Sequence, residues 1–345
     1  MKAVQWNSQK KEIEINDVHV PEPGEHQFLV KIASASLCHS DLMSIGDAFV
    51  SVDRSKPVTL GHEGAGWVER LHPSAEGKGF KQGDAVGFLY IIDCCFECEG
   101  CMVHNNHCLE QQSQIQGFTR DGFFAEYALV DYHSAVVLPK ELDVRNSSPL
   151  FCAGVTSFHC VESCGLESGQ TLVIIGCGGL GQMAIQFAKA MDYQVIGVDI
   201  SDDILQEAKK QGADHTFNSL SDKDYVGKVK QLTTGRGADT VAVFSAADAA
   251  YRSAPLLVKL GGTIMVVGLP ARGVTFNALD IARGTYKVRG DSTGIPQRMP
   301  RAIDFIAKNG IRPELEVYNS LDDVPSMIEK MQSGKATKKM IVSLF

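Results

Sequence analysis

Three short motifs supply residue types that bind zinc. Cys38 begins the run Cys-His-Ser-Asp, His62 and Glu63 lie in Gly-His-Glu, and Cys152 begins Cys-Ala-Gly-Val-Thr. Zinc binds cysteine sulfur, histidine nitrogen and carboxylate oxygen tetrahedrally, and a catalytic zinc leaves one position for water or substrate. It lowers the pKa of bound water from about 15.7 toward about 7, and a bound alcohol would be acidified similarly. These residues predict a catalytic zinc site, with Asp41 as a candidate acceptor for the free N–H of His62.

A glycine-rich loop follows an apolar segment in the second half of the chain. Gly176, Gly178 and Gly181 form Gly-x-Gly-x-x-Gly between an expected strand and an expected helix. Such glycines permit a tight turn and close approach of a pyrophosphate to the helix N-terminus. Asp199 ends the next expected strand, where a carboxylate accepts hydrogen bonds from the adenosine ribose and repels a 2′-phosphate. No arginine or lysine follows within several positions, so NAD is favoured over NADP.

Each of these features has a simpler explanation when it is taken alone. A single cysteine is most often a small buried hydrophobe, and a single histidine is more often packed or hydrogen-bonded than bound to a metal. The loop could be a glycine turn in an unrelated α/β protein, and Cys177 within it is interpreted as a filler side chain, with a redox switch as the alternative. The combination of zinc ligands and nucleotide loop on one chain argues against coincidence.

The chain has ten cysteines, and five of them fall between residues 94 and 108. Disulfides are rare in a reducing cytosol, so metal binding or catalysis is the first interpretation. Four thiolates close the coordination shell of zinc, and such a metal holds a loop rather than doing chemistry. The favoured ligands are Cys95, Cys98, Cys101 and Cys108, with Cys94, His104 and His107 as nearby alternatives. A metal-free lobe with free thiols is the alternative interpretation.

The composition limits the classes of function. A chain of 345 residues is too long for one typical core and suits two domains. It is 44% hydrophobic and 21% charged, as in globular proteins, and its net charge of -8 argues against nucleic acid or an anionic membrane as the partner. No apolar run approaches the ~20 residues that span a bilayer, and the N-terminus lacks the apolar core of a signal peptide. The expected location is therefore cytoplasmic.

The elements that must position these motifs follow two patterns. Short β-rich segments separated by glycine and proline fill residues 1–150 and suggest a barrel-like domain. Strands alternate with helices over 151–290, which predicts an α/β doubly wound parallel sheet, and residues 291–345 are mixed. The expected strands are 28–33, 64–70, 84–88, 171–175, 194–199, 240–244, 262–268 and 339–344, and the expected helices are 181–191, 203–211, 301–308 and 322–331.

Through these motifs the chain resembles the zinc-dependent alcohol dehydrogenases of the medium-chain dehydrogenase/reductase family, and most of all their yeast and bacterial tetrameric branch. The resemblance extends from the opening Lys-Ala-Val segment to the Gly-Lys pair at 334–335. It implies a GroES-like catalytic domain at 1–150, a Rossmann NAD-binding domain at 151–290, and a C-terminal segment at 291–345 that completes the catalytic domain. It also implies one catalytic and one structural zinc, NAD as the cofactor, and a homotetramer, with a dimer as the alternative.

The same resemblance assigns roles to individual residues. Cys38, His62 and Cys152 match the catalytic zinc ligands, and Glu63 matches the acid that can replace the water ligand. Ser40 matches the hydroxyl that takes the alcohol proton, and His39 a residue that contacts the cofactor pyrophosphate. Lys339 aligns with a basic residue, usually arginine, that helps to hold the phosphates; lysine keeps the charge but loses the bidentate fork. The residues assigned to the cofactor site are Gly176, Gly178, Gly179, Leu180, Gly181, Asp199, Val267, His39 and Lys339.

Three features depart from the family pattern. Many relatives carry a histidine shortly after the Cys-His-Ser/Thr-Asp motif that ends the proton relay, whereas residues 42–46 contain none, so the relay must end on water or another group. Phe49 and Tyr90 fall where relatives carry pocket-lining aromatics, often tryptophan. Smaller rings there would admit an alcohol larger than ethanol, or both rings merely pack the core. The gap between Cys101 and Cys108 has six residues where the family usually has seven.

The leading hypothesis is reversible hydride transfer between a small primary or secondary alcohol and NAD, which gives an aldehyde or ketone. One alternative is a zinc-independent quinone or enone reductase on the same scaffold, although such relatives lack the metal ligands that this chain has. The other is a zinc-stabilised binding protein that uses the cysteine lobe to contact nucleic acid or protein. The acidic balance and the lack of a basic stripe near residues 95–108 argue against it.

Overall fold

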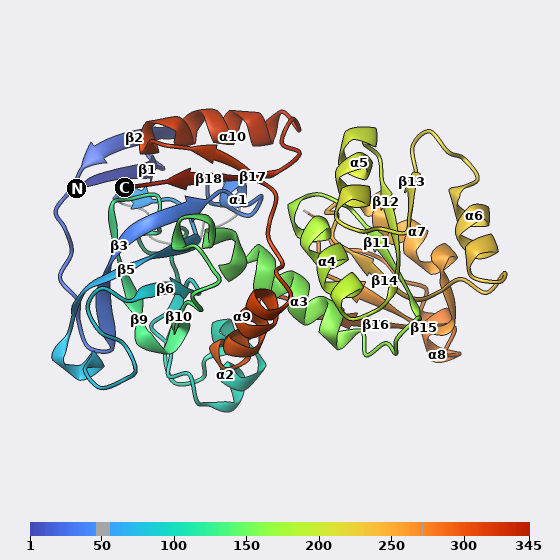
Figure 1. Ribbon diagram of the computed structural model, residues 1–345, viewed down its shortest axis with the longest axis horizontal. Coiled ribbons are helices and arrows are strands. Elements are labelled where there is room, and N and C mark those ends of the chain that lie inside the picture. Colours follow the sequence, from blue (N-terminus) through green and yellow to red (C-terminus); the bar gives the residue numbers. More distant parts are fainter. Residues whose placement is uncertain (46–55, 271) are drawn as a thin grey trace. The chain divides into compact units, whose positions relative to one another are not determined.

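The computed structural model describes residues 1–45, 56–270 and 272–345, so the candidate pocket residue Phe49 lies outside the described part. The chain forms two compact units (Figure 1). The first unit comprises Met1–Cys152, Gly294–Gly310 and Glu314–Phe345, and the second comprises Ala153–Thr293 and Ile311–Pro313. The first unit thus contains the candidate zinc ligands, and the second contains the glycine loop.

Seven strands form the main sheet of the first unit, in the order β10-β6-β5-β3-β18-β17 with β9 also paired to β3. They are β3 (Gln27–Ser36), β5 (Glu63–Leu71), β6 (Ala85–Phe88), β9 (Tyr127–Asp131), β10 (Ala135–Val137), β17 (Leu315–Tyr318) and β18 (Lys339–Ser343). The C-terminal strand β18 pairs antiparallel with β3, with Ile341 opposite Ser36, and Figure 1 shows the two strands side by side. The Leu37 N–H also donates to Met340 O (3.0 Å). This pairing sets Lys339 beside the segment that follows β3.

Two smaller sheets complete the β structure described for the first unit. One has the order β2-β1-β4 and the other pairs β7 with β8. Their strands are β1 (Lys2–Asn7), β2 (Glu12–Asp17), β4 (Val58–Thr59), β7 (Ile91–Ile92) and β8 (Gln114–Ile115). The hydrophobic core of the unit includes Phe28, Phe88, Phe123, Phe124 and Met340, which are fully buried. Burial of this apolar surface stabilises the unit by roughly 25 cal/mol per Å².

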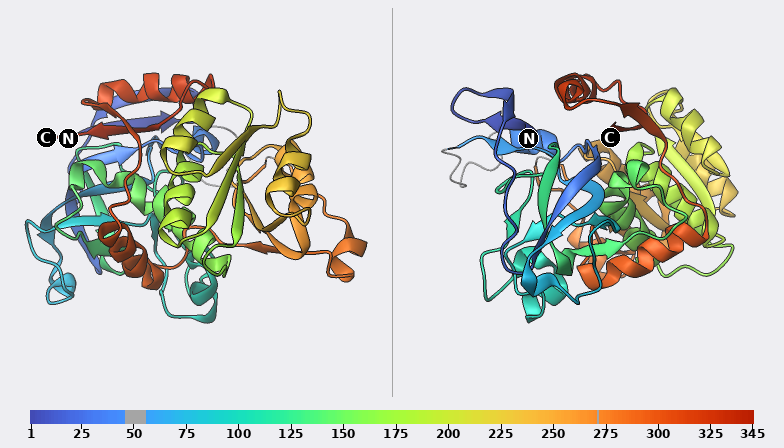
Figure 2. Two further views of the ribbon diagram at one scale, coloured as in Figure 1. Left: turned by 45° about the vertical axis from the view of Figure 1, so that its right-hand side comes forward. Right: turned by 60° about the vertical axis from the view of Figure 1, so that its left-hand side comes forward.

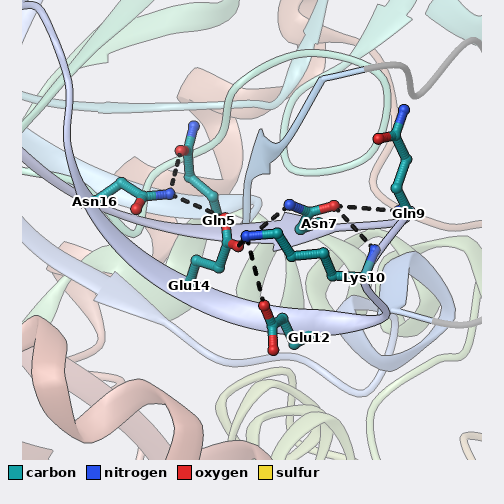
Figure 3. A network of polar contacts seen from close by, with 7 residues as sticks. All are labelled: Gln5, Asn7, Gln9, Lys10, Glu12, Glu14 and Asn16. Carbon is teal, nitrogen blue, oxygen red and sulfur yellow. Dashed lines mark hydrogen bonds and ion pairs between the residues drawn. The ribbon is translucent and has the colours of Figure 1, made fainter.

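Polar side chains hold the turn of the β1–β2 hairpin (Figure 3). Asn7 Oδ1 accepts hydrogen bonds from the backbone N–H groups of Gln9 (3.2 Å) and Lys10 (3.1 Å). Lys10 Nζ lies 2.6 Å from Glu14 Oε1 and 3.7 Å from Glu12 Oε1. The hydrogen bond from Lys10 is the main reason that the pKa of Glu14 is lowered to about 2. Because Lys10 is exposed, these ion pairs contribute little stability, and their main effect is to fix the turn.

Helices and short 3-10 turns connect the strands of the first unit. The α-helices are α1 (Asp41–Ile45), α2 (Glu99–Val103), α9 (Met299–Lys308) and α10 (Val324–Gln332). The 3-10 turns are η2 (Pro73–Ala75), η3 (Asn105–His107), η4 (Tyr132–Ser134), η5 (Val144–Asn146), η6 (Ser148–Phe151), η7 (Pro296–Arg298) and η8 (Leu321–Asp323). Helix α10 packs against the core of the unit through Val324, Met327 and Ile328.

The second unit is built on six strands in the order β13-β12-β11-β14-β15-β16, and every neighbouring pair is parallel. They are β11 (Thr171–Ile175), β12 (Gln194–Asp199), β13 (His215–Asn218), β14 (Ala238–Val243), β15 (Val258–Val266) and β16 (Tyr286–Gly290). Numbered within the sheet, this is the order 3-2-1-4-5-6 of dinucleotide-binding folds, which bind ligands at the carboxyl edge where the order reverses. Helices cover both faces (Figure 2). The α-helices of this unit are α3 (Ala153–Ser163), α4 (Gly179–Ala190), α5 (Asp202–Lys210), α6 (Tyr225–Leu232), α7 (Asp248–Leu257) and α8 (Ala278–Ala282).

The fold class expected from the sequence is confirmed. The strands expected at 171–175 and 194–199 have the same bounds in the structure. The helix expected from residue 181 begins earlier, at Gly179, because Gly178 serves as its N-cap. The strand expected from residue 262 begins earlier, at Val258. Among the described residues, no helix combines the length and the apolar character that crossing a bilayer requires.

Candidate active site and metal centres

Strand pairing brings the first candidate zinc ligands together. Cys38 lies just after the end of β3, and His62 lies just before the start of β5. These strands are antiparallel, with Ser36 opposite Glu63, so the residues that flank them emerge at the same end of the sheet. Cys152 follows the short turn η6, which contacts both β3 and β5. Three segments that are distant in the sequence therefore meet at one point.

The four candidate ligands form one buried cluster. The ligand atoms of Cys38, His62, Glu63 and Cys152 all lie within 4.8 Å of one another. The exposed fractions of these residues are 6%, 1%, 0% and 8%. A hydrogen bond with the Cys152 thiol, together with the charges of Lys339 and His62, lowers the pKa of the Cys38 thiol although burial opposes this. Such a dense set of buried ionisable groups is typical of a metal centre.

Asp41 fixes the orientation of His62. Its Oδ1 lies 2.6 Å from His62 Nδ1, the contact expected from the sequence, and its Oδ2 accepts a hydrogen bond from the Cys38 N–H (2.8 Å). Asp41 itself is fully buried. A carboxylate in this position holds the proton on Nδ1 and leaves Nε2 as the atom that can bind a metal.

Glu63 has two differently placed carboxylate oxygens. Oε2 lies 2.6 Å from Lys339 Nζ and accepts a hydrogen bond from Ser36 Oγ. Oε1 is buried and has no hydrogen-bond partner among the described residues. Burial raises the pKa of Glu63 to about 7, although the charge of Lys339 acts in the opposite direction. A buried carboxylate oxygen without a partner among the described residues, on a member of this cluster, is a further sign that a cation belongs here.

Two aromatic rings pack on the imidazole of His62. The Tyr90 ring lies 4.9 Å from it between centroids, and the Phe118 ring lies 5.2 Å from it. Tyr90 was expected near a substrate pocket, and it is half-buried in this position. Phe118 was not expected at this site, because it follows a loop glycine and belongs to none of the motifs recognised in the sequence.

Ser40 and His39 lie between Cys38 and the start of helix α1. Ser40 is half-buried and His39 is exposed. The backbone carbonyl groups of both residues accept hydrogen bonds from the first turns of α1. These bonds fix the main chain of both residues.

Lys339 lies inside the metal cluster. The residue is only 6% exposed, and its ammonium donates to Leu37 O (3.0 Å) in addition to pairing with Glu63. Burial alone would lower its pKa, but the charges of Glu63 and Cys38 raise it above the usual value. Its expected contact with cofactor phosphates stays a prediction.

The cysteine lobe brings four sulfur atoms together. The Sγ atoms of Cys95, Cys98, Cys101 and Cys108 lie within 4.8 Å of one another. Cys95 Sγ is 3.9 Å from Cys101 Sγ and 3.7 Å from Cys108 Sγ. Tetrahedral zinc with Zn–S bonds of about 2.3 Å requires sulfur atoms about 3.8 Å apart. The gap of six residues before Cys108 therefore still allows tetrahedral geometry.

Backbone amides support this lobe. The N–H groups of Cys98 and Leu109 each point at a cysteine sulfur, at 3.3 Å. Hydrogen bonds of this kind stabilise thiolates. Cys94, one of the alternative ligands, is a buried thiol whose pKa is raised to about 12, chiefly by burial. It lies outside the group of four sulfurs.

The glycine loop has the geometry that a pyrophosphate needs. Gly176 has φ of +91°, and a Cβ on Gly181 would lie 2.1 Å from Gly176 O, so both positions require glycine. A Cβ on Gly178, in contrast, would meet no atom within 4 Å. Gly179 and Leu180 begin helix α4, whose first N–H groups are free for an anion. Cys177 is fully buried, as the filler interpretation predicts.

Asp199 lies at the carboxyl end of β12, beside this loop. Its Oδ2 accepts a hydrogen bond from the Cys177 N–H (2.8 Å), and its Oδ1 accepts from the N–H groups of Ile200 (2.7 Å) and Ser201 (3.1 Å). A carboxylate accepts about four hydrogen bonds, so capacity remains for a ribose hydroxyl. Val267 lies just beyond the end of β15 at the same edge and is buried.

Comparison with known proteins agrees with this geometry. Residues 24–140 match the family model of the alcohol dehydrogenase GroES-like domain, and residues 179–308 match that of the zinc-binding dehydrogenases. An alcohol dehydrogenase of Geobacillus stearothermophilus is 34% identical over 345 residues, which covers 100% of this chain and 99% of that protein. The chain belongs to the zinc-type alcohol dehydrogenase family. Membership identifies zinc as the metal for which the thiol-rich clusters are built.

Solved structures place the fold in the same family. The alcohol dehydrogenase of the archaeon Aeropyrum pernix has a TM-score of 0.88 and 26% identity, and the match covers 99% of this chain and 100% of that one. A structure described as an NAD-dependent alcohol dehydrogenase has a TM-score of 0.88 and 25% identity, with 100% of both chains covered. This member of the zinc-type alcohol dehydrogenases is thus similar to its relatives over its full length.

Proposed function

We propose that this protein is an NAD-dependent zinc alcohol dehydrogenase that interconverts a primary or secondary alcohol and the corresponding aldehyde or ketone. The observation that carries the proposal is the buried cluster of two thiols, an imidazole and a carboxylate. It occurs in a chain whose other unit has the strand order and the glycine loop of a dinucleotide-binding fold. The two features together supply a place for an alcohol and a place for a hydride acceptor.

The residues of the cluster fit a catalytic zinc. Zinc bound there would act as a Lewis acid toward the alcohol oxygen. Cys38 and Cys152 would balance its charge as thiolates, and Asp41 would hold the imidazole of His62 in the orientation for binding through Nε2. Glu63 would offer Oε1, the oxygen that has no other partner among the described residues.

The second unit fits NAD as the hydride acceptor. Open space around Gly178 and the N-terminus of α4 would take the pyrophosphate, and Asp199 would accept hydrogen bonds from the adenosine ribose. A carboxylate at this position disfavours the 2′-phosphate of NADP. We include Val267 and His39 as further contacts of the cofactor, on the strength of the family resemblance.

Ser40 is the residue that we assign to proton removal. Its half-buried hydroxyl lies two positions after the ligand Cys38, so its backbone is fixed relative to the metal site. Residues 42–46 contain no histidine to receive the proton from it. We therefore expect the proton to pass from Ser40 to water, with Tyr90 lining the site through its contact with His62.

The test is an NAD-coupled activity screen over short, branched and aromatic alcohols, on protein with measured zinc content. A Cys38→Ala variant should lose turnover, because one zinc ligand is gone, while it keeps NAD affinity. A Cys160→Ala variant removes a buried cysteine of the second unit that belongs to neither metal cluster and serves as the control. Full turnover by Cys38→Ala, or no NAD-linked oxidation by any zinc-loaded preparation, would refute the proposal.

The structural zinc, the location and the assembly complete the proposal. We place a second zinc in the cysteine lobe, which the sulfur spacing supports. All ten cysteines are free in the structure, and thiolate metal sites suit a reducing compartment such as the cytoplasm. The resemblance to the tetrameric branch supports a homotetramer over a dimer, and mass photometry of the zinc-loaded protein would distinguish the two.

A further inference from the structure

We propose that Lys339 is the counter-ion of the catalytic metal centre, and that it acts with Ser36 to hold one oxygen of Glu63 so that the other can bind the metal. This inference rests on the zinc site of the proposed function. It differs from the role in cofactor binding that the family resemblance assigns to this position. In this account Lys339 positions a metal ligand instead of a phosphate.

The contacts of Lys339 carry the proposal. Its ammonium lies 2.6 Å from Glu63 Oε2 and donates to Leu37 O at 3.0 Å, so two of its three N–H donors are committed inside the first unit. The residue is 6% exposed, and Glu63 is fully buried. Ser36 Oγ donates to the same oxygen, Oε2. Both donors therefore bind Oε2 and leave Oε1 without a hydrogen-bond partner among the described residues, on a residue whose carboxylate belongs to the cluster of thiols.

The charges explain why a cation is needed in this position. Zinc carries two positive charges, and thiolates at Cys38 and Cys152 would cancel them. The carboxylates of Asp41 and Glu63, both fully buried, would then give the cluster a net negative charge. Burial of an unpaired charge is costly, and the ammonium of Lys339, 2.6 Å from Glu63 Oε2, offsets one of these negative charges.

The strand pairing makes the arrangement rigid. Lys339 is the first residue of β18, and Ser36 is the last residue of β3. These two strands are hydrogen-bonded neighbours in the main sheet, and Glu63 begins β5 on the other side of β3. Ser36 lies opposite Glu63 and opposite Ile341, and Lys339 lies two residues before Ile341, so the three side chains share one face of the sheet. This placement limits the movement of Glu63 away from the metal.

The decisive experiment measures zinc retention in the absence of NAD and alcohol. Zinc-loaded wild type, Lys339→Met and Lys338→Met are titrated with a chromogenic zinc chelator. Lys338 is the matched control, since it is the neighbouring lysine and pairs with Glu314 at 3.4 Å away from the cluster. We expect Lys339→Met to lose about 10- to 100-fold in zinc affinity at the catalytic site, while Lys338→Met and the zinc of the cysteine lobe are unchanged. Retained lobe zinc also shows that the variant is folded.

A double variant separates charge balance from a merely structural role. Glu63→Gln removes the negative charge with which Lys339 pairs, so the loss of the ammonium should weaken zinc binding less. We therefore expect Glu63→Gln/Lys339→Met to bind zinc more tightly than Lys339→Met alone. If Lys339 had only a structural role, the losses of zinc affinity caused by Glu63→Gln and by Lys339→Met would add up in the double variant. Wild-type zinc affinity in Lys339→Met, or a double variant no better than Lys339→Met, would overturn the proposal.

The outcome does not depend on the reaction. If no alcohol is oxidised but the zinc pattern is as expected, the proposed function fails and the counter-ion role stands. NAD affinity is measured in parallel by equilibrium dialysis, and we expect Lys339→Met to stay within about threefold of wild type. Wild-type zinc affinity combined with a tenfold loss of NAD affinity would assign Lys339 to the phosphates and refute the proposal.

Discussion

Single residues around the metal cluster act by holding the ligands. Asp41 reaches both a ligand histidine and the backbone of a ligand cysteine, at 2.6 Å and 2.8 Å. A carboxylate behind a ligand histidine fixes its tautomer and raises its basicity. The metal affinity of the site should therefore depend on a residue that does not itself touch the metal.

We predict that Asp41→Asn lowers zinc affinity at the catalytic site by about 10-fold or more. The amide keeps the shape of the side chain but loses the charge that favours the Nδ1–H tautomer of His62. Zinc competition with a chelator measures the effect. Asp304→Asn, on the exposed face of α9 in the same unit, is the control and should bind zinc as wild type does. Equal affinities for the two variants would contradict the prediction.

At the scale of elements, the cysteine lobe shows four sulfur atoms at zinc-binding distances although the sequence spacing before Cys108 is one residue shorter than is usual in the family. We predict that Cys108→Ser reduces the zinc content from about two atoms per chain to about one and lowers the melting temperature, because a serine hydroxyl is a poor zinc ligand. Cys94→Ser is the matched control, since Cys94 lies in the lobe but outside the group of four sulfurs. Zinc analysis by mass spectrometry measures both. Loss of zinc from Cys94→Ser alone would show that the ligands are assigned wrongly.

In the glycine loop of the second unit, Gly178 borders open space that a ligand can occupy. A Cβ at Gly178 would meet no protein atom within 4 Å. We predict that Gly178→Ala weakens NAD binding by at least about tenfold, because the methyl group occupies the path of the pyrophosphate. The unfolding midpoint should fall only slightly, because alanine is a poorer N-cap than glycine but meets no steric clash. Gly273→Ala is the control, because it is also open and needs no positive φ. Isothermal titration calorimetry measures the NAD affinity of both variants. An unchanged NAD affinity in Gly178→Ala would place the pyrophosphate elsewhere.

At the scale of the whole molecule, all the candidate zinc ligands lie in the first unit, so the second unit must be held together by other contacts. One half-buried contact in its sheet is made by Asp239 on β14, which accepts a hydrogen bond from the Thr171 N–H on β11 (2.8 Å) and pairs with Lys259 on β15. Burial would raise the pKa of Asp239, but Lys259 and Thr171 together lower it below the usual 3.8. The carboxylate thus joins three neighbouring strands.

We predict that Asp239→Asn lowers the free energy of unfolding by about 1 kcal/mol near neutral pH. Because the folded pKa is depressed, this contribution is complete above the unfolded value near 3.8 and is lost as the pH falls through the folded value. The difference in the free energy of unfolding between wild type and variant should stay constant down to about pH 4 and disappear below it. Thermal unfolding over this pH range measures this difference. A difference that increases on acidification would show that the sign is wrong.

Much of the fold followed from local pattern. The strand at 171–175, the glycine loop and the strand that ends at Asp199 were expected with the bounds that the structure has, because hydrophobic runs and glycine turns are properties of neighbouring residues. Cys38, His62 and Cys152 could also be predicted as ligands from the sequence, since only a few types of side chain bind zinc.

The tertiary structure alone decided how distant residues meet. The hydrogen bond between Lys339 and Leu37 spans 302 positions, and the ring of Phe118 reaches His62 from a loop without a motif. Six residues between Cys101 and Cys108 are enough to bring the two sulfur atoms together, because η3 folds this segment into a compact turn. Such contacts depend on strand register and loop path, which no periodicity within one segment encodes. The sequence by itself thus determined which side chains can bind zinc and a dinucleotide. The pairing of β18 with β3 decided that Lys339 lies beside the candidate zinc ligands.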